Sequence, residues 1–452
     1  MTPAKMTPGE VTPEVLVGAA PTLTRVMWCD NAGITRAKAV TRQGLPAALR
    51  QGVGLSMGQQ GLPMMQDTVV EGSGLSAVGE VRLVPDLSTF TELPYAPGSA
   101  AVLGDMRTLH GDPWVHCPRT FARRQVEGLA ALGYRVVASF ENEFYLYDAQ
   151  GPLDQGVYAS LQSFERAHPF TLALLEALEA QGLTPEMYYP ESGPGQQEIP
   201  IAPAEGVAAA DRQLLFKATV NAVARQHGLR ASFAAKPLLS GAGSGCHLHL
   251  SLWQGGRNAF SQPGGVLGLS RLARQAIAGV LAHLPGLCAL SVPSVNSYRR
   301  LQAGQWAGAF ACYGLDNREA SVRVASSHLL SGAGGDTTNF ELKTCDASAN
   351  PYLALGGLLA AVLDGLRHDL DPGEPLGVSP GSLGETARAA MGIVPLPGSL
   401  PEALRALEAD EVLLGALGPE LSRSFTAVRA SEAVFFAGQD EETELSMHRF
   451  VY

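Results

Sequence analysis

Two glutamates in one stretch of the sequence are the residues best placed to do chemistry. The segment Phe140–Tyr147 has the composition of a strand, and successive strand side chains point to opposite faces, so Glu141 and Glu143 share one face. Two half-buried carboxylates side by side repel each other unless a cation or a proton neutralises them. Taken alone, the pair fits a solvated strand face equally well, so the interpretation depends on partners from other segments.

Three other segments supply such partners. They contribute two carboxylates that flank a Gly-Pro-Gly-Gln turn, two imidazoles at strand spacing and one further carboxylate: Glu191, Glu198, His247, His249 and Glu341. A lone histidine is more often a satisfied core or surface residue than a ligand. Carboxylates together with imidazole, however, suit hard or borderline divalent ions such as magnesium and manganese. The joint occurrence predicts a metal-binding cage of five carboxylates with one or two imidazoles.

Arginines and a glycine-rich loop extend this set. Arg318 and Arg323 flank a short strand pattern, although both could be rim charges of that strand. The glycines of segment 241–245 could let the backbone approach a phosphate or a carboxylate, which by itself is a weak signal. In phosphoryl transfer, carboxylate-held divalent ions bridge phosphate oxygens and arginines neutralise developing charge. The residues thus indicate metal-dependent nucleotide chemistry and leave its acceptor open.

Size and composition limit the classes of protein that this site can belong to. The chain of 452 residues is longer than one core usually holds, which predicts two domains or one large domain with a smaller partner. Hydrophobic residues make up 46% and charged residues 17%, as in a folded rather than a disordered protein. A formal net charge of −11 without a basic stripe argues against a nucleic-acid partner.

The sequence also argues against a membrane-bound or secreted protein. No apolar signal-peptide core follows Met1, and the longest apolar run, Ala278–Val295, is interrupted by His283, Pro285 and Pro293. The six cysteines are scattered without metal-site spacing and are predicted to be reduced and buried. We therefore expect a soluble, cytoplasmic protein with no membrane partner.

Secondary-structure signals indicate which elements position the candidate residues. Short apolar runs between Gly/Pro turns predict a small strand-rich domain at 14–108, after a loose tail at 1–13 and before a larger domain at 109–452. The larger domain has predicted strands at 134–147, 196–201, 230–236, 246–253, 319–325 and 339–344, and predicted helices at 120–132, 171–181, 205–227, 268–284, 351–369 and 400–408. Because the acids and histidines fall on strands or adjoining turns, we expect a site on the concave face of one sheet.

A series of short motifs runs in order along the chain. They are Val84-Pro-Asp-Leu-Ser-Thr-Phe90, Pro94-Tyr-Ala-Pro-Gly98, Glu141-Asn-Glu-Phe144, Glu191-Ser-Gly-Pro-Gly-Gln-Gln-Glu198, Lys236-Pro-Leu238, Gly243-Ser-Gly-Cys-His-Leu-His249, Asn296-Ser-Tyr-Arg-Arg-Leu301, Asn317-Arg318, Ser321-Val-Arg323 and Asn350-Pro-Tyr-Leu353. With these motifs the chain resembles the glutamine synthetase family over nearly its whole length. The resemblance implies an α+β fold, with a small N-terminal β-grasp-like domain and a large catalytic domain built on a curved antiparallel sheet with flanking helices. It also implies a homo-oligomer of stacked rings, such as a dodecamer, with each active site between neighbouring subunits.

The resemblance further implies two or more magnesium or manganese ions in each site. The implied ligands of the first ion are Glu143, Glu191 and Glu198. The implied ligands of the second ion, which bridges the nucleotide phosphates, are Glu141, His247 and Glu341. ATP is the implied co-substrate, and His249 and Ser251 match positions that line its pocket.

The implied chemistry is transfer of the terminal phosphate of ATP to a side-chain carboxylate, followed by attack of an amine or ammonia on the acyl phosphate. Arg318 and Arg323 match arginines that contact the phosphates and the acyl phosphate. Arg300 matches an arginine that holds the carboxylate of the acid substrate, and Gly243 matches a substrate-binding glycine. The resemblance thus implies an ATP-dependent carbon–nitrogen ligase of nitrogen metabolism.

The chain departs from the family pattern at the ammonia site. Trp306 occupies the position of the flap glutamate of ammonia-using members, Lys343 that of a carboxylate-holding arginine and Ala242 that of a loop asparagine. Segment 55–60 has no counterpart of the Asp-Gly-Ser-Ser stretch whose aspartate helps to deprotonate ammonium. An indole can pack against an alkyl chain and attract a cationic head, whereas lysine lacks the bidentate geometry of arginine.

Three functions are compatible with the sequence. The preferred one is an ATP-dependent ligase that joins a glutamate-like carboxylate to an organic amine or polyamine, because the metal cage is intact while the ammonia site is altered. The second is a glutamate–ammonia ligase with an altered flap, and the third is a catalytically silent homologue that acts as a regulatory or structural ring protein. The candidate substrate-binding residues are Gly243, Arg300, Trp306 and Lys343.

Overall fold

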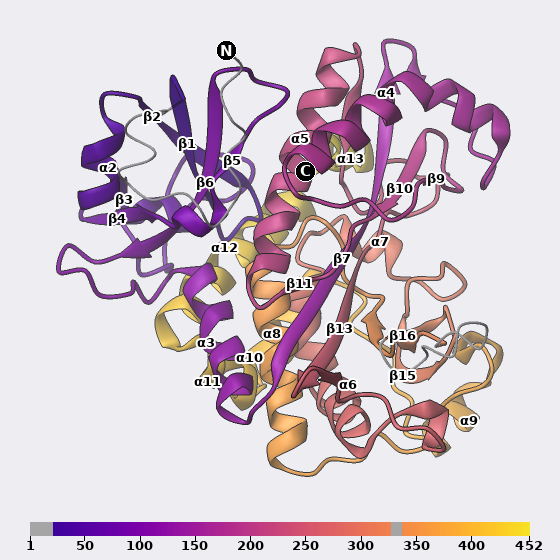
Figure 1. Ribbon diagram of the computed structural model, residues 1–452. Helices are drawn as coiled ribbons and strands as arrows, with labels where there is room; N and C mark the ends of the chain where they lie inside the picture. The colour runs from indigo at the N-terminus through magenta and orange to yellow at the C-terminus, as the bar shows by residue number, and fades with distance from the viewer. Residues whose placement is uncertain (1–20, 327–336) are drawn as a thin grey trace.

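The structure consists of a smaller and a larger part, each built on its own sheet (Figure 1). It is a computed structural model that describes residues 21–326 and 337–452, so the predicted tail at 1–13 lies outside the described residues. The predicted α+β class, with a small N-terminal part and a large part in which helices flank a sheet, is confirmed. The predicted division into 14–108 and 109–452 stays a prediction.

The N-terminal sheet contributes side chains to two cores, one on each of its faces. Its elements are β1 (Leu23–Cys29), β2 (Thr35–Thr41), α2 (Leu45–Gln51), β3 (Val53–Ser56), β4 (Glu80–Pro85), β5 (Thr91–Glu92) and β6 (Ser99–Arg107). The strand order is β2-β1-β6-β4-β3, with β5 paired to β6. On β1, Val26 and Trp28 pack into a small core within this part, while Met27 and Cys29 join the main core of the larger part.

The larger sheet is organised around one long central strand, β7 (Arg135–Asp148). The other strands are β8 (Gly151–Pro152), β9 (Tyr189–Pro190), β10 (Gln196–Pro200), β11 (Ala204–Glu205), β12 (Arg230–Ser232), β13 (Cys246–Gln254), β14 (Arg257–Asn258), β15 (Phe310–Leu315), β16 (Ala320–Val324) and β17 (Phe340–Leu342). The order is β15-β16-β17-β13-β7-β10-β9, while β8, β11 and β12 also pair with β7. β7 runs antiparallel to β10 and β13, and β15 runs parallel to β16.

Helices cover the larger sheet and connect the two parts. They are α3 (Pro118–Ala131), α4 (Leu161–Ala180), α5 (Ala208–Gln226), α6 (Arg271–Ser291), α7 (Ser297–Arg300), α8 (Pro351–Arg367), α9 (Glu385–Ala390), α10 (Leu400–Glu408), α11 (Glu411–Leu417), α12 (Pro419–Ala437) and α13 (Glu441–Val451). Short 3-10 helices lie at Met57–Gly61, Leu87–Thr89, Val266–Gly268 and Pro380–Ser382. α12 passes beside the N-terminal part (Figure 1), where Asn31 donates to Ser424 at 3.1 Å and the backbone N–H of Met64 donates to Glu432 at 2.8 Å.

Two helices continue through a proline near which the sequence predicts a helix end. The predicted helix 171–181 starts just after Pro169, and the predicted helix 268–284 ends just before Pro285. α4 begins at Leu161 and contains Pro169, and α6 ends at Ser291 and contains Pro285. A proline inside a helix removes one backbone hydrogen bond. The apolar side chains on either side of each proline are buried in the main core, and this burial offsets the lost bond.

Other differences from the prediction have similar tertiary causes. β12 ends at Ser232 rather than near residue 236, because the backbone N–H of Phe233 donates to the carbonyl of Tyr452 at 3.1 Å instead of continuing the ladder. α12 is not among the predicted helices. It buries charged residues as well as apolar ones, including Arg429 and Glu432, and this mixture obscures the helical period.

The buried cysteines and the apolar helix α6 bear on the predictions about redox state and membranes. All six cysteines are free and buried, as predicted. One helix among the described residues, α6, is long and apolar enough to cross a membrane by length and composition. However, 67% of its most apolar window is buried inside the protein, as in the core helix of a globular protein, and α6 packs there against α8.

α6 and α8 cross closely at two glycines. A Cβ atom at Gly279 would lie 2.1 Å from the carbonyl oxygen of Ala361, and one at Gly365 would lie 2.1 Å from the carbonyl oxygen of Gln275. Both contacts are with helical backbone, which cannot move aside like the end of a flexible side chain. The crossing therefore depends on the absence of side chains at these positions.

We predict that Gly279→Ala destabilises the protein by about 1–3 kcal/mol, because the added methyl group forces the two helix backbones apart. The midpoint of urea unfolding measures this change. Gly415→Ala on α11 is the matched control, because no atom of the described residues beyond its own helical turn and chain neighbours lies within 4 Å of the added Cβ. Alanine also favours a helix more than glycine does. A Gly279→Ala midpoint equal to that of the wild type would contradict the close crossing.

Candidate metal and nucleotide site

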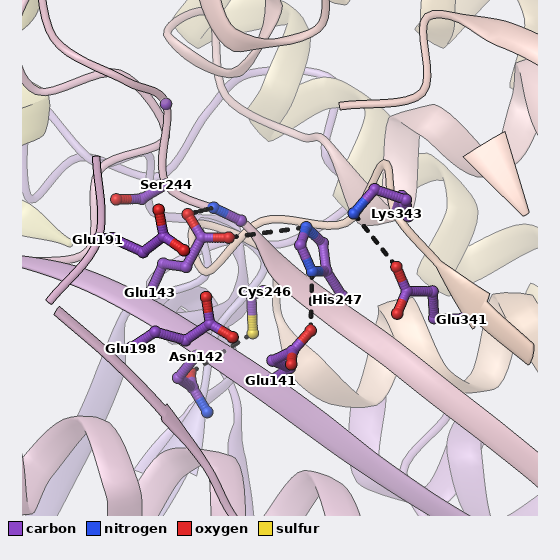
Figure 2. A network of polar contacts seen from close by, with 12 residues as sticks. Glu141, Asn142, Glu143, Glu191, Glu198, Ser244, Cys246, His247, Glu341 and Lys343 are labelled. Carbon is purple, nitrogen blue, oxygen red and sulfur yellow. Dashed lines mark hydrogen bonds and ion pairs between the residues drawn. The ribbon is translucent and has the colours of Figure 1, made fainter. Parts of the chain in front are cut away.

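Strand register places both predicted histidines and all the predicted acids except Glu191 in one row across the larger sheet. The facing pairs, in order from β10 to β16, are Glu198 with Glu143, Glu141 with His247, His249 with Glu341, and Glu341 with Arg323. Facing residues of paired strands have Cβ atoms about 4.5–5.5 Å apart. Figure 2 shows the carboxylates and the His247 ring converging between these strands. We call this set of residues the acid row.

Glu143 is held by groups from neighbouring segments. Its Oε2 accepts hydrogen bonds from the backbone N–H of Gly245 and from the side-chain amide of Gln196, both at 2.9 Å. Nε2 of His247 lies 3.7 Å from its Oε1. The carboxylate of Glu191 lies beside that of Glu143 in Figure 2, so two like charges share this end of the row.

Crowding raises the pKa of two acids at this end. Burial raises the pKa of Glu143 to about 7; Arg300 opposes the shift and Glu191 adds to it. Burial and the neighbouring carboxylates raise the pKa of Glu198 well above its usual range, and the hydroxyl of Tyr189 donates to its carboxylate. Buried like charges favour the proton-bound form, and a divalent cation in place of the proton would relieve the same repulsion.

The two histidines occupy different places in the row. Nδ1 of His247 lies 3.0 Å from Oε2 of Glu141, and its Nε2 lies 3.2 Å from Nη2 of Arg300. Because the guanidinium can only donate, Nε2 accepts and the neutral ring donates from Nδ1 to Glu141. Nε2 of His249 lies 3.5 Å from Oε2 of Glu141 and 3.2 Å from Oε2 of Glu341.

These surroundings move the two imidazole pKa values apart. Burial and the nearby Lys343 lower the pKa of His247 to about 4, so its ring is neutral at pH 7. Burial also opposes charge on His249, but its hydrogen bond with Glu141 and the charge of Glu341 outweigh burial and raise its pKa to about 9. Metal binding requires a neutral imidazole, so His247 is already in the binding form and His249 would first release a proton.

Glu341 is fully buried and is neutralised by the protein itself. Nζ of Lys343 lies 3.1 Å from its Oε1, and Nη1 of Arg323 lies 3.0 Å from its Oε2. Burial raises the pKa of Glu341, but Lys343 and His249 outweigh burial and lower the pKa to about 2. Lys343, which the sequence assigns to substrate binding, is therefore engaged with an acid of the row in this structure.

Two glycines make the convergence at Glu143 possible. A Cβ atom at Gly245 would lie 2.5 Å from Nε2 of His247 and 2.9 Å from Oε1 of Glu143, and one at Gly243 would lie 2.5 Å from Cγ of Arg300. Any side chain at either position would push these groups apart. The glycine-rich loop thus lets its backbone approach the acid row closely. The N–H of Gly245 donates to the carboxylate of Glu143 rather than to a substrate.

The donor groups of the row fit divalent cations by chemistry and by position. One group whose ligand atoms lie within 4.8 Å of one another comprises Glu141, His249 and Glu341. The sequence prediction instead combines His247 with Glu141 and Glu341, and both rings contact Glu141 in the structure. Glu143 and Glu198, the carboxylates with raised pKa values, lie beside this group. They add two carboxylates whose mutual repulsion a cation would relieve.

Three predicted site residues, Trp306, Arg318 and Ser251, have their side-chain or backbone contacts with residues outside the acid row. Trp306 is exposed over 63% of its surface, and the exposed guanidinium of Arg318 lies 5.9 Å from the centre of its ring. Ser251 lies two residues beyond His249 on β13, where its hydroxyl accepts a hydrogen bond from the indole of Trp253 at 3.0 Å. Arg318 and Trp306 thus form a pair at the surface.

Several residues that contact the row are not among the predicted ones. The hydroxyl of Tyr189 binds Glu198, the amide of Gln196 binds Glu143, and Oδ1 of Asn339 lies 2.9 Å from Nδ1 of His249. Each stands two positions before a predicted acid, namely Glu191, Glu198 or Glu341. Because residues two apart on a strand share a face, the strand period around each acid is the signal that could have identified these partners.

Comparison with known proteins places the whole chain in one family. Residues 18–114 match the glutamine synthetase N-terminal domain, and residues 115–448 match the glutamine synthetase catalytic domain. The chain is 38% identical over 434 residues to gamma-glutamylpolyamine synthetase GlnA3 of Streptomyces coelicolor, covering 94% of this chain and 92% of that protein. It is 34% identical over 426 residues to the glutamine synthetase of Pyrococcus abyssi, covering 93% of this chain and 92% of that protein.

Solved structures agree with this relationship. A novel glutamine synthase homolog superposes with a TM-score of 0.87 at 35% identity, covering 96% of this chain and 99% of that chain. A GmaS/ADP complex superposes with a TM-score of 0.83 at 28% identity, covering 96% of this chain and 97% of that chain. The chain therefore belongs to the glutamine synthetase family and is an ATP-dependent carbon–nitrogen ligase.

Proposed function

We propose that the protein joins a glutamate-like carboxylate to an organic amine or polyamine. The observation that carries this proposal is the exposed indole of Trp306 at the flap position, where ammonia-using members of the family have a glutamate. With the indole there, ammonium loses an anionic partner. An indole instead offers an apolar face to an alkyl chain and an electron-rich face to a cationic nitrogen.

Two further observations support an organic amine as the acceptor. Segment 55–60, where ammonia-using members have an aspartate, contains the fully buried Gln60, whose amide nitrogen lies 3.5 Å from the sulfur of Met106. The segment has no carboxylate that could accept a proton from ammonium. In addition, the relative with 38% identity is named as a gamma-glutamylpolyamine synthetase.

The proposed reaction has two steps. First, an oxygen of the acid substrate's side-chain carboxylate forms a bond to the terminal phosphorus of ATP, while the bond from that phosphorus to the ADP oxygen breaks. Then the amine nitrogen bonds to the acyl carbon, inorganic phosphate leaves and the nitrogen loses a proton, which gives the amide. ATP is needed because a free carboxylate is a poor electrophile, whereas an acyl phosphate is a good one.

We propose that magnesium or manganese ions bind the acid row. One ion would be held by Glu143, Glu191 and Glu198, and a second by Glu141, His247 and Glu341. Such ions would neutralise negative charge on the phosphates during phosphoryl transfer. The raised pKa values of Glu143 and Glu198 and the neutral ring of His247 support this assignment.

Cationic and polar side chains around the row complete the proposed site. Arg323 stands at the end of the row, 3.0 Å from Glu341, where it would stabilise negative charge on the transferred phosphate together with Arg318. Arg300 is buried and hydrogen-bonded to His247. From this position Arg300 would hold the carboxylate of the acid substrate next to the row. The remaining proposed contacts are Gly243 and Lys343 with the acid substrate, and His249 and Ser251 with the nucleotide.

The proposed assembly is a homo-oligomer of stacked rings, such as a dodecamer, located in the cytoplasm. This part of the proposal rests on family membership, and its partners are small molecules: an amino acid, ATP and an amine. The acidic net charge of −11 supports the absence of a nucleic-acid partner.

A glutamate–ammonia ligase is the second candidate. The relationship to the glutamine synthetase of Pyrococcus abyssi at 34% identity favours it. The residue at the flap distinguishes the two candidates, because only the organic amine gains from apolar contact with Trp306. A silent homologue is not kept as a candidate, because members of this family are ATP-dependent ligases and all six predicted metal ligands are present in the sequence.

We predict that Glu143→Ala and His247→Ala each abolish divalent-dependent ATP turnover, because each removes a ligand from a site whose charge balance depends on it. Phosphate release in the presence of magnesium or manganese is the measurement. Glu408→Gln, which alters an exposed acid on α10, is the matched control and should keep wild-type turnover. Near-normal turnover by either site variant would remove the metal assignment.

We predict that the wild type uses some alkylamine or diamine more efficiently than ammonia. Each methylene buried against the indole contributes about 0.8 kcal/mol, so kcat/KM should rise roughly fourfold per added methylene until the pocket is filled. Trp306→Glu should restore part of the ammonia use and weaken alkylamine use. Phosphate release and mass spectrometry of the amide product, over a panel of amines, measure both effects.

Trp306→Phe is the control for this experiment, because it keeps an aromatic face without adding a charge. Its preference for the organic amine over ammonia should persist. Two results would refute the proposal. One is a wild type that makes free glutamine at least as efficiently as any amide of an organic amine, and the other is a Trp306→Glu variant with an unchanged product ratio.

A further inference from the structure

We propose that Glu319 is the positioning residue that fixes Trp306, so that the acceptor preference depends on Glu319 as well as on the indole. This inference rests on the proposed function, because it concerns the same flap loop, residues 302–306. Glu319 lies in the turn between β15 and β16 and is not among the residues predicted from the sequence. The hydrogen bonds from its carboxylate to the flap loop assign this positioning role.

The carboxylate of Glu319 binds two backbone N–H groups of the flap loop. Its Oε2 accepts from the N–H of Gly304 at 3.0 Å, and its Oε1 accepts from the N–H of Trp306 at 2.9 Å. Hydrogen bonds to an ionised acceptor are roughly twice as strong as those between neutral groups. Because each oxygen of Glu319 binds a different N–H of the loop, the carboxylate orients the loop.

Trp306 adopts a backbone conformation that its surroundings must stabilise. Its φ is +57°, in the left-handed region that residues with a side chain rarely adopt. The N–H that Glu319 binds belongs to this same residue. The hydrogen bond thus acts directly on the strained conformation, and that conformation determines where the indole projects.

The turn that carries Glu319 is itself anchored. The side-chain amide of Asn317 donates to the carbonyls of Leu376 and Val378, both at 2.9 Å. Its Oδ1 accepts from the backbone N–H of Glu319 at 3.2 Å. These hydrogen bonds tie the turn to a segment outside the flap. The backbone that carries the Glu319 carboxylate is therefore held in place.

The chain on the far side of the flap is also fixed. Ala307 is fully buried, and Gly308 has a φ of +75°. A Cβ atom at Gly308 would lie 2.6 Å from Cα of Ser321 on β16, so the backbone here is pressed against the sheet. Between this point and Arg300, the contacts of Glu319 hold the exposed tip.

Both segments that Glu319 joins lead to the acid row. The turn leads to Arg323, whose Nη2 lies 3.5 Å from Oδ1 of Asp316 and whose Nη1 lies 3.0 Å from Glu341. The flap begins after Arg300, which is hydrogen-bonded within the row. Glu319 therefore sets the distance between the indole and the groups proposed to act on the acyl phosphate.

Tryptophan fluorescence gives a readout of this role that does not depend on activity. Of the four tryptophans, Trp28 and Trp114 are 4% and 3% exposed, and Trp253 is half-buried with its indole N–H bound to Ser251. Trp306 is 63% exposed and is the one that lies on the flap loop, so loosening the flap changes the mobility of Trp306 in particular. Glu319→Ala should lower the steady-state anisotropy of the emission. Glu319→Gln, which keeps one acceptor oxygen, should fall between Glu319→Ala and the wild type. In a Trp306→Phe background, Glu319→Ala should leave the anisotropy unchanged.

Kinetics provide the second readout. Glu319→Ala should raise KM for the organic amine by about 10- to 100-fold, because misplacing a positioning group by about 1 Å has effects of this size. KM for ATP and for the acid should change much less. In the Trp306→Phe background the effect on the amine should shrink, since the two residues act as a unit. Glu408→Gln is again the control, and sedimentation verifies that each variant assembles like the wild type.

An unchanged anisotropy in assembled Glu319→Ala overturns the inference, whatever the amine preference of the wild type. An equal rise in KM for ATP, acid and amine also overturns it, because that pattern indicates a general structural defect. A lowered anisotropy in a protein whose wild type prefers ammonia supports the positioning role and refutes only the proposed acceptor. The two failures are therefore distinguishable.

Discussion

Repulsion between carboxylates that strand register forces together is the constraint on which this structure depends. Glu198 faces Glu143 across β10 and β7, and burial denies both acids the water that would screen their charges. The protein neutralises Glu341 with Lys343 and Arg323, whereas within residues 21–326 and 337–452 no such pair of cations forms ion pairs with Glu143 and Glu198 at the other end of the row. One end is thus balanced by the fold, and the other requires protons or metal ions from solution.

Much of this arrangement follows from the sequence, because strand alternation is a local property. The spacing of Glu141 and Glu143 is enough to place both on one face of β7. The later acids except Glu191, and both histidines, fall on strands of the same sheet. Register is not local, so the sequence could not show which histidine would approach Glu341. The proline in α6 was misleading for a similar reason, since burial against α8 outweighs a lost hydrogen bond there.

The two halves of the proposed reaction are built on different kinds of structure. The groups assigned to phosphoryl transfer stand on paired strands, whose ladders fix their positions within narrow limits. The residue assigned to the acceptor stands on a loop whose tip is held by the carboxylate of Glu319. A change in the loop can therefore alter the acceptor without disturbing the acid row, which would allow one phosphorylating site to serve different amines.

The central position of β7 also has a consequence for how the chain is made. Its partner β10 follows after a long helix, and its partner β13 is translated later still, after β12. Until then the apolar residues of β7 lie on an unpaired strand edge, which is a template for association with other chains. Synthesis proceeds at about 5–20 residues per second, so this edge stays open for seconds on each ribosome. Shielding by chaperones during translation is therefore most valuable in the interval between β7 and β13.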